Sequence, residues 1–208
     1  MKYYKKSIVL LIITSVYSTA FAQGAFEKMG KQAWINGDYK NAIIQLEKAD
    51  NTDPNNANVL KMLGYSYFQS GDFENSIAAY SRLIAVKSTD YSAYYYRGKA
   101  RLNIANSPKE SLNQMRENFY QSAIKDFTKA IEINGEEDVQ ILQNRGLAYK
   151  DYAIFKSYKV KKSTEKAACI TLFNNSTADF QKVLTMQPLR KDIIGWVDYV
   201  KAQVVSLK

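Results

Sequence analysis

Apolar residues recur along the chain with the spacing of an amphipathic α-helix. In four segments an aromatic residue is followed three positions later by Ala or Ser, four positions after that by an apolar residue, and three positions further on by another. Residues at these spacings fall on one face of a helix. The pattern therefore predicts four amphipathic helices, within residues 39–54, 73–88, 120–135 and 173–188.

A glycine precedes each of these segments, inside another helical pattern. The first three glycines are 34 residues apart. Because a glycine in a helix interior costs roughly 1 kcal/mol relative to alanine, its recurrence predicts a compensating close approach of two helices. We expect each glycine to face the small residue of the following helix. The glycines are Gly30, Gly64, Gly98 and Gly146, and the expected partners are Ala42, Ser76, Ala123 and Ser176.

Turns and stop signals separate the predicted helices. A Gly-Asp dipeptide at 37–38 recurs at 71–72, which is typical of a chain reversal in which Gly ends one helix and Asp begins the next. Pro54 and Pro188 follow two of the amphipathic segments and bias the preceding residue out of the helical region. The sequence therefore predicts a series of helical hairpins.

The 34-residue pattern resembles the tetratricopeptide repeat, and the resemblance covers about residues 23–190. The second repeat keeps the family pattern best, with Leu60, Leu63, Gly64, Tyr67, Gly71, Asp72, Phe73, Ser76 and Tyr80. The first repeat departs from it, with Met29 and Ala33 where the family has Leu and Tyr. The resemblance implies an all-α fold, a right-handed solenoid of four helix–turn–helix repeats, and a scaffold that could host many partners.

We divide the chain into three parts on this basis. Residues 1–22 are expected to be a signal peptide, residues 23–190 the repeat array and residues 191–208 a capping helix. The expected repeats cover about residues 23–56, 57–90, 91–137 and 139–190. The last helix has one apolar face, made of Ile193, Trp196, Val197, Val200 and Val204. We expect it to cover the last repeat, as the ends of solenoids require, and docking of a partner on it is the alternative.

The third and fourth repeats are longer than the first two. From the glycine to the small residue of the next helix there are 12 positions in repeats one and two, 25 in repeat three and 30 in repeat four. We interpret the additional residues as extra helical turns that lengthen both hairpins. In repeat three, Ser107 is the expected N-cap, with Pro108 and Glu110 completing the helix start. In repeat four we expect a turn near residues 161–163 and a helix capped by Thr164.

The two lengthened hairpins are expected to project from one edge and to pack on each other. The expected contacts are Leu112, Met115, Phe119, Tyr152, Phe155 and Tyr158. Lysines gather at the expected tip, which consists of Lys156, Lys159, Lys161, Lys162 and Lys166. We interpret this basic tip either as a second contact surface or as a solvated end that keeps the protein soluble.

The N-terminus has the features of a bacterial secretory signal peptide. Three lysines lie within residues 1–6, an apolar run covers residues 7–16, and Ala-Phe-Ala at 20–22 is a small-residue cleavage site. We expect cleavage near Ala22-Gln23 and export to the periplasm or out of the cell. A membrane anchor is the alternative, although the apolar run is shorter than the roughly 20 residues that span a bilayer. No Cys lies directly after the run, so a lipid anchor at this place is not expected.

The chain is basic, which limits the choice of partner. Its formal net charge of +9 falls to +6 without the three N-terminal lysines. A basic exported protein favours an acidic protein segment, anionic lipid or anionic polysaccharide. Export makes nucleic acid an unexpected partner, and after signal removal we do not expect an integral membrane protein.

Catalytic chemistry is not expected. The sequence has no His and a single Cys, Cys169, which excludes His bases, Ser-His and Cys-His pairs, and metal sites built from His or several thiolates. The apolar neighbours of Cys169 predict a buried side chain. The carboxylates at residues 136–138 are interpreted as a helix cap, which leaves a carboxylate-only hydrolase as the remaining catalytic alternative. We therefore expect neither a cofactor nor a metal.

The family resemblance implies that the first helix of each repeat lines a concave binding face. Aromatic side chains on that face can take up apolar peptide side chains, and lysines can pair with carboxylates. The candidates for partner contact are Lys31, Trp34, Lys61, Tyr65, Phe68, Tyr95, Lys99 and Gln143, with Glu27, Leu102 and Leu147 on the same expected face. Packing between repeats is the alternative role, for Trp34 and Leu102 above all.

The carboxylate clamp of chaperone-binding tetratricopeptide domains is absent. Its positions are occupied here by Glu27, Lys31, Met62, Ser92 and Tyr96. We therefore expect a non-catalytic scaffold of the bacterial cell envelope that binds an extended segment of another protein in the groove. The alternatives are an assembly subunit of an envelope complex and a binder of anionic polysaccharide or lipid through the basic tip.

Overall fold

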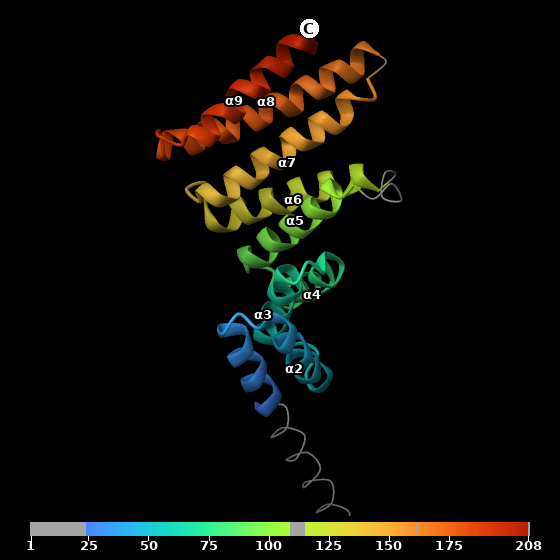
Figure 1. Ribbon diagram of the computed structural model, residues 1–208, viewed down its shortest axis with the longest axis vertical. Coiled ribbons are helices and arrows are strands. Elements are labelled where there is room, and N and C mark those ends of the chain that lie inside the picture. Colours follow the sequence, from blue (N-terminus) through green and yellow to red (C-terminus); the bar gives the residue numbers. More distant parts are fainter. Residues whose placement is uncertain (1–23, 109–114, 161, 208) are drawn as a thin grey trace, which may run out of the picture. The chain divides into compact units, whose positions relative to one another are not determined.

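The computed structural model describes residues 24–108, 115–160 and 162–207, which form α-helices joined by turns (Figure 1). A helix at residues 24–35 is followed by α2 (Tyr39–Thr52), α3 (Ala57–Gln69), α4 (Phe73–Val86), α5 (Tyr91–Asn106), α6 (Arg116–Asn134), α7 (Val139–Ser157), α8 (Ser163–Met186) and α9 (Lys191–Leu207). These described ranges contain no β-strand, and the all-α fold class is confirmed. The expected signal peptide lies outside them.

The helices form two compact units, divided between Lys87 and Ser88. The first unit contains the helix at residues 24–35 and α2 to α4, and the second contains α5 to α9. Within the first, α2 packs on α3 and α3 on α4. Within the second, α5 packs on α6, α6 on α7, α7 on α8 and α8 on α9. Each unit therefore consists of helices that pack mainly on their neighbours in the sequence.

The predicted apolar stripe forms the core of each hairpin. In α2, Ala42, Leu46 and Ala49 are fully buried. In α8, Phe173, Phe180 and Val183 are fully buried as well. The spacing of the stripe therefore identified the buried face of the second helix in each repeat.

The predicted Gly-Asp turns are confirmed. Gly37 and Gly71 have φ angles of 75° and 78°, a left-handed conformation that glycine adopts without a steric penalty. The following aspartates cap the next helices, because the Asp38 carboxylate accepts a hydrogen bond from the backbone N–H of Asn41 at 3.1 Å. Asp72 makes the equivalent bond with Asn75 at 3.2 Å.

The prolines end the helices that they follow. Helix α2 ends at Thr52 and α8 at Met186, two residues before Pro54 and Pro188 respectively. The residues just before the prolines have non-helical backbones, with φ and ψ of −141° and 85° at Asp53 and of −136° and 74° at Gln187. Such a backbone suits a residue that precedes proline, but proline is not required for it, because Lys87 before Ser88 has φ −143° and ψ 77° at the end of α4.

The helical glycines allow close approach, but the side chain in the space of each missing Cβ differs from the one predicted. A Cβ atom on Gly146 would lie 2.7 Å from the Phe180 ring, and one on Gly64 would lie 3.0 Å from the Tyr80 ring. The equivalent partners of Gly30 and Gly98 are Leu46 and Phe127. Each glycine therefore faces the large apolar residue four positions after the expected small one. The prediction that Ala42, Ser76, Ala123 and Ser176 fill this space was wrong, although the predicted approach of Ser76 and Ser176 to their glycines is confirmed.

The small residues approach the same glycines at the backbone. The Ser76 hydroxyl donates a hydrogen bond to the Gly64 carbonyl at 2.9 Å, and the Ser176 hydroxyl donates one to the Gly146 carbonyl at 2.8 Å. Both serines are fully buried. The large side chain thus occupies the space of the missing Cβ, while the serine hydrogen-bonds to the backbone at the same crossing.

Two buried aspartates paired with arginines distinguish the second unit. Asp126 on α6 accepts hydrogen bonds from Arg97 at 2.7 and 3.0 Å and from Arg101 at 2.6 Å. Asp179 on α8 accepts bonds from Arg145 at 2.7 and 2.8 Å. Arg97 and Arg145 each immediately precede a crossing glycine. Each aspartate and its arginines therefore connect the two helices of one repeat beside the crossing.

The insertions lengthen the hairpins, as predicted. Helices α6, α7 and α8 have 19, 19 and 24 residues, against 14, 13 and 14 for α2, α3 and α4. Figure 1 shows α7 and α8 side by side as the two arms of one hairpin.

Both predicted starts of the inserted helices were wrong. Ser107 is the C-cap of α5, with φ −62° and ψ 138°, because the following Pro108 disfavours a helical backbone there. Helix α6 begins at Arg116, and Glu110 lies outside the described residues. Thr164 lies within the first turn of α8, which begins at Ser163.

An aromatic cluster joins the lengthened hairpins. Tyr120 stacks on Tyr152 with ring centroids 5.6 Å apart, and it lies 5.7 Å from Phe155. Of the predicted contacts, Tyr152 is buried and Phe119 and Phe155 are half-buried against the core. Met115 and Tyr158 are exposed, so their prediction was wrong, and Leu112 lies outside the described residues. Tyr120, the first residue of its apolar stripe, makes the contact between the hairpins that was expected of Met115 and Tyr158.

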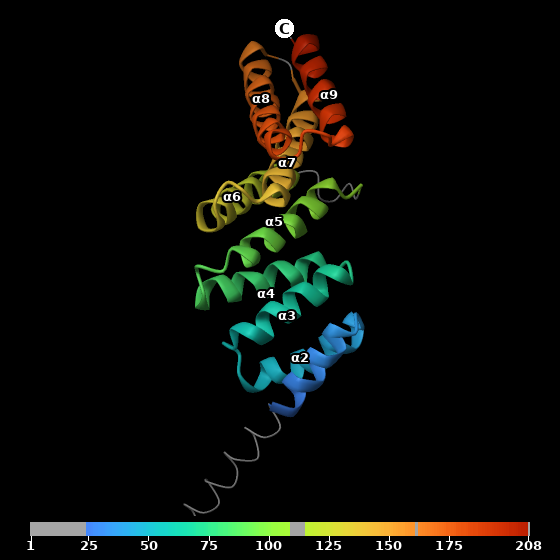
Figure 2. The same ribbon diagram turned by 90° about the vertical axis from the view of Figure 1, so that its left-hand side faces the viewer.

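Helix α9 packs on α8 with the predicted face (Figure 2). Ile193, Val197 and Val200 are buried, and the Trp196 ring lies 5.4 Å from the Phe180 ring. Asp198 and Lys201 are exposed. The helix therefore extends the apolar core of the last repeat and presents polar residues to solvent.

Gly146→Ala should destabilise the protein, because the added Cβ would collide with the fully buried Phe180 ring. Overpacking of this kind costs roughly 1–3 kcal/mol. Gly195→Ala is the matched control, since Gly195 is also within a helix but its Cβ would meet nothing within 4 Å among the described residues. Helix propensity predicts a gain of about 1 kcal/mol there. Urea unfolding followed by circular dichroism measures both changes, and effects of the same sign would contradict the role of the crossing.

Asp179→Ala should lower the free energy of unfolding by about 3–5 kcal/mol, because it leaves the Arg145 charge unpaired in a largely buried place. Repeat two has Leu63 and Ala79 at the equivalent positions. Adding Arg145→Leu to Asp179→Ala reproduces that combination and should recover most of the loss. Urea unfolding of both single variants and the double variant measures the coupling. A double variant no more stable than Asp179→Ala would show that the ion pair does not account for the effect.

Candidate partner-binding surfaces

In the first unit, the predicted groove residues form an aromatic cluster with lysines nearby. The Tyr65 ring lies between those of Trp34 and Tyr39, 5.8 Å from each in edge-to-face geometry. Lys31 and Lys61 are exposed. Burial, with a smaller contribution from Tyr65, raises the pKa of Tyr39.

Packing accounts for part of this aromatic cluster. Trp34 is half-buried and packs on the core of the first unit, and Phe68 lies 5.6 Å from Phe73. The Trp34 indole N–H is buried without a hydrogen-bond acceptor among the described residues. Trp34 therefore contributes to packing, the alternative role that its sequence position left open.

In the second unit, two predicted groove residues line one pocket. Tyr95 on α5 and Gln143 on α7 face a cavity of about 870 Å³. Most of the lining comes from polar side chains at the end of α6, the start of α7 and the segment before α9. The other lining residues are Asn134, Glu137, Asp138, Val139, Gln140, Asn144, Gln187 and Arg190. We call this cavity the carboxamide pocket, after its five Asn and Gln side chains.

Hydrogen bonds fix the walls of the carboxamide pocket. The Asn144 amide donates to the Tyr95 hydroxyl at 3.2 Å and to the Gln140 backbone carbonyl at 2.8 Å. Arg190 donates to the Gln143 side-chain oxygen at 2.9 Å and to that of Gln187 at 3.0 Å. The Asn144–Tyr95 bond joins α7 to α5, and the Arg190–Gln143 bond holds the segment before α9 against α7.

The carboxamide pocket is polar without a strong net charge. Its charged side chains are Glu137, Asp138 and Arg190, and Arg190 is also paired with Asp192 at 2.7 Å. Burial, followed by smaller effects of Tyr96 and Asp138, raises the pKa of Tyr95 to about 12. At neutral pH the phenol is therefore protonated and can both donate and accept hydrogen bonds. The pocket can recognise a ligand through hydrogen bonds to neutral groups.

Lys99 lies beside this pocket and not in its wall. Its ammonium group lies 5.4 Å from the Tyr95 ring centre and 5.6 Å from that of Tyr96. Burial lowers the pKa of Lys99. Leu102, the next predicted groove residue on α5, is buried in the core. The predicted row of contacts on α5 thus divides into one pocket residue, one half-buried lysine and one core residue.

Sequence reasoning missed Gln140, Asn144 and Arg190. The two carboxamides are three residues before and one residue after Gln143, so their helical spacing could have placed them on neighbouring parts of one surface. Arg190 had no such signal, because it lies outside the apolar pattern of the last helix. Its contribution depends on the turn after α8, which brings it back to α7.

The basic tip is less uniform than predicted. Lys156 pairs with Glu117 on α6 at 2.9 Å, and hydrogen bonds from Tyr152 and Lys156 lower the pKa of Glu117. The Lys159 ammonium group lies 4.2 Å from the centre of the Phe155 ring. Lys162 and Lys166 are exposed, and Lys161 lies outside the described residues. Lys156 thus connects the two hairpins, whereas the exposed charges lie on the turn and at the start of α8.

The described residues show no grouping of three or more His, Cys, Asp or Glu side chains that could hold a metal ion. Cys169, a free thiol, is fully buried, and burial raises its pKa. A membrane-spanning helix would need greater length and apolar content than any helix in the described part of the chain has.

Comparison with known proteins supports the sequence resemblance. The sequence model of the TPR repeat family matches residues 64–104. No curated protein matches the chain.

Solved structures share the fold at low sequence identity. The crystal structure of MamA protein is 20% identical with a TM-score of 0.57, covering 86% of this chain and 90% of that one. MamA 41-end from Desulfovibrio magneticus RS-1 is 14% identical with a TM-score of 0.60, covering 89% and 94%. TTC0263, a thermophilic TPR protein in Thermus thermophilus, is 15% identical with a TM-score of 0.50, covering 86% and 99%. The chain thus has the all-α fold of these proteins, and its resemblance to the tetratricopeptide repeat is supported by the family match over residues 64–104.

Proposed function

We propose that this protein is a non-catalytic interaction scaffold that binds an extended segment of another protein in the carboxamide pocket. The observation that carries the proposal is the convergence of Tyr95, Gln140, Gln143, Asn144 and Arg190 on one cavity. Carboxamides donate and accept hydrogen bonds, and a peptide backbone in extended conformation presents both kinds of group. Folds of this type host protein partners on surfaces built from repeated helices.

The charge of the carboxamide pocket refines the expected partner. Two carboxylates and one guanidinium line it, so it offers no cluster of positive charge to an acidic segment. Recognition there would depend on hydrogen bonds and shape. The exposed Lys31 of the first unit is a separate candidate for pairing with an acidic segment.

We place this activity in the bacterial cell envelope, after removal of residues 1–22. The support comes from the sequence, in which positive, apolar and small-residue segments follow one another in the order of a signal peptide. Cell fractionation with an antibody against the protein tests this part, and recovery of the uncleaved chain from the cytoplasm would contradict it.

Gln140→Ala with Gln143→Ala should weaken binding of peptides selected from a random phage-displayed library on the full chain. Two lost side-chain hydrogen bonds at about 1 kcal/mol each correspond to a roughly 30-fold weaker affinity. Fluorescence anisotropy with the selected peptides measures the change.

Gln181→Ala is the control for this experiment, because Gln181 is an exposed glutamine on α8 that does not line the carboxamide pocket. Circular dichroism establishes that the double variant is folded. Peptides that bind all three proteins equally would contradict the proposed site, and so would a library that yields no binder.

A further inference from the structure

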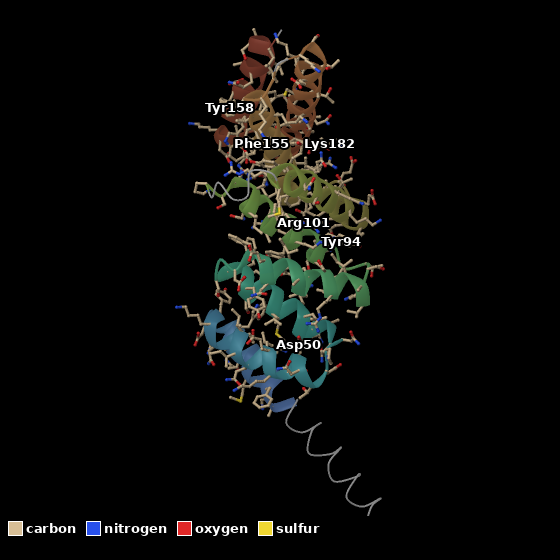
Figure 3. The ribbon with its side chains drawn as sticks, turned by 90° about the vertical axis from the view of Figure 1, so that its right-hand side faces the viewer. Asp50, Tyr94, Arg101, Phe155, Tyr158 and Lys182 are labelled. Carbon is tan, nitrogen blue, oxygen red and sulfur yellow. The ribbon has the colours of Figure 1, made fainter. Side chains whose placement is uncertain are left out.

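The turn between α7 and α8 exposes an aromatic side chain beside several lysines. Tyr158 is 85% exposed, far more than the half-buried Phe155 one helical turn before it. Figure 3 shows both residues on the α7–α8 hairpin, with Lys182 further along α8. An aromatic ring left in water at the end of a hairpin contributes nothing to the core of the unit.

Exposed lysines follow this ring in the sequence, in the turn after α7 and at the start of α8. Lys159 follows Tyr158 directly, and Lys162 and Lys166 are four residues apart at the start of α8, where this spacing places them on one face. All three are exposed. Together with Tyr158 they lie at the turn between α7 and α8 and the start of α8, and we call these four residues the aromatic–lysine tip.

The acidic residues near the aromatic–lysine tip leave it with an excess of positive charge. Glu117 is occupied by Lys156 and by the Tyr152 hydroxyl, which donates to it at 2.6 Å. Glu165 accepts a hydrogen bond from the Lys162 backbone N–H at 3.0 Å, and so it stabilises the start of α8. Three lysines against this one remaining carboxylate give a formal local charge of +2.

We propose that the aromatic–lysine tip docks the protein on an anionic lipid bilayer. Tyrosine rings favour the headgroup region of a membrane, where the apolar ring meets lipid and the hydroxyl meets water. Lysines near an anionic surface are attracted to its negative potential. An exposed ring flanked by cations at the end of a hairpin combines both requirements, and it does not depend on the carboxamide pocket.

The contact is weak and reversible by itself. Each lysine close to an anionic surface contributes about 1 kcal/mol, and stable membrane attachment needs more than one such signal. The aromatic–lysine tip would therefore orient the second unit at a surface, and the carboxamide pocket would remain available to a protein partner.

Co-sedimentation of the full chain with vesicles tests the proposal. Binding is compared between vesicles of phosphatidylcholine alone and an equimolar mixture of phosphatidylcholine and phosphatidylglycerol. Combined Lys159→Glu, Lys162→Glu and Lys166→Glu substitutions should weaken binding to the anionic vesicles roughly 100-fold, since loss of three lysines removes about 3 kcal/mol. Tyr158→Ala should weaken it less, and raised salt should weaken it further.

The matched control reverses three exposed lysines elsewhere: Lys28, Lys40 and Lys201. This variant has the same net charge as the tip variant and should retain binding. A local probe separates the tip from any contribution of residues 1–22. An environment-sensitive fluorophore on Ser163→Cys should shift to shorter wavelength with anionic vesicles, whereas the same fluorophore on Ser206→Cys should not.

Three results would overturn the proposal. The tip and control variants could lose binding equally, which would indicate a general effect of charge. The fluorophore at residue 163 could remain unchanged when the full chain binds vesicles, which would place the contact elsewhere. The tip could instead bind an acidic protein segment or an anionic polysaccharide while anionic vesicles fail to bind, which would assign it to another class of partner.

Discussion

The close approach of two helices at a glycine is the constraint on which each repeat depends. A buried leucine, tyrosine or phenylalanine from the second helix occupies the space where a Cβ would otherwise lie. The glycine lowers helix propensity, and the contact with a fully buried side chain offsets this loss through dispersion and burial. Because the crossing sets the distance between the helices, it also determines which flanking residues can meet. The buried serine–carbonyl bonds and the Arg–Asp pairs lie beside these crossings.

The second unit adds Arg–Asp ion pairs to the glycine crossing that all repeats share. Where repeats one and two have Met29 and Leu63 before the glycine, repeats three and four have Arg97 and Arg145. Buried ion pairs are expensive to desolvate and often add little net stability. Their fixed hydrogen-bond geometry, however, restricts how α5 and α7 lie on their partner helices. We infer that this restriction helps to hold Tyr95 and Gln143, which lie on the same two helices, at the carboxamide pocket.

Much of the fold could be predicted from the sequence, because it depends on repeated spacings and on short local motifs. The apolar stripe identified the buried faces, and Gly-Asp and Pro identified turns and helix ends. The large residue that fills the space at each glycine could not be predicted, because periodicity does not fix how one helix is rotated against the next. Ser107 resembled an N-cap, but it ends α5, and α6 begins only at Arg116. The Arg–Asp pairs could have been found by comparing repeats, since arginine and aspartate replace neutral residues at equivalent positions in both long repeats.

The carboxamide pocket was less predictable, because Arg190 reaches it only through the turn between α8 and α9. The most direct test of the account is site-specific photo-crosslinking in the native host, with a benzophenone amino acid at Gln140 or at the exposed Gln181 of α8. The account predicts a specific crosslinked protein from position 140 and none from position 181. Crosslinking to the same protein from both positions, or from position 181 alone, would contradict it.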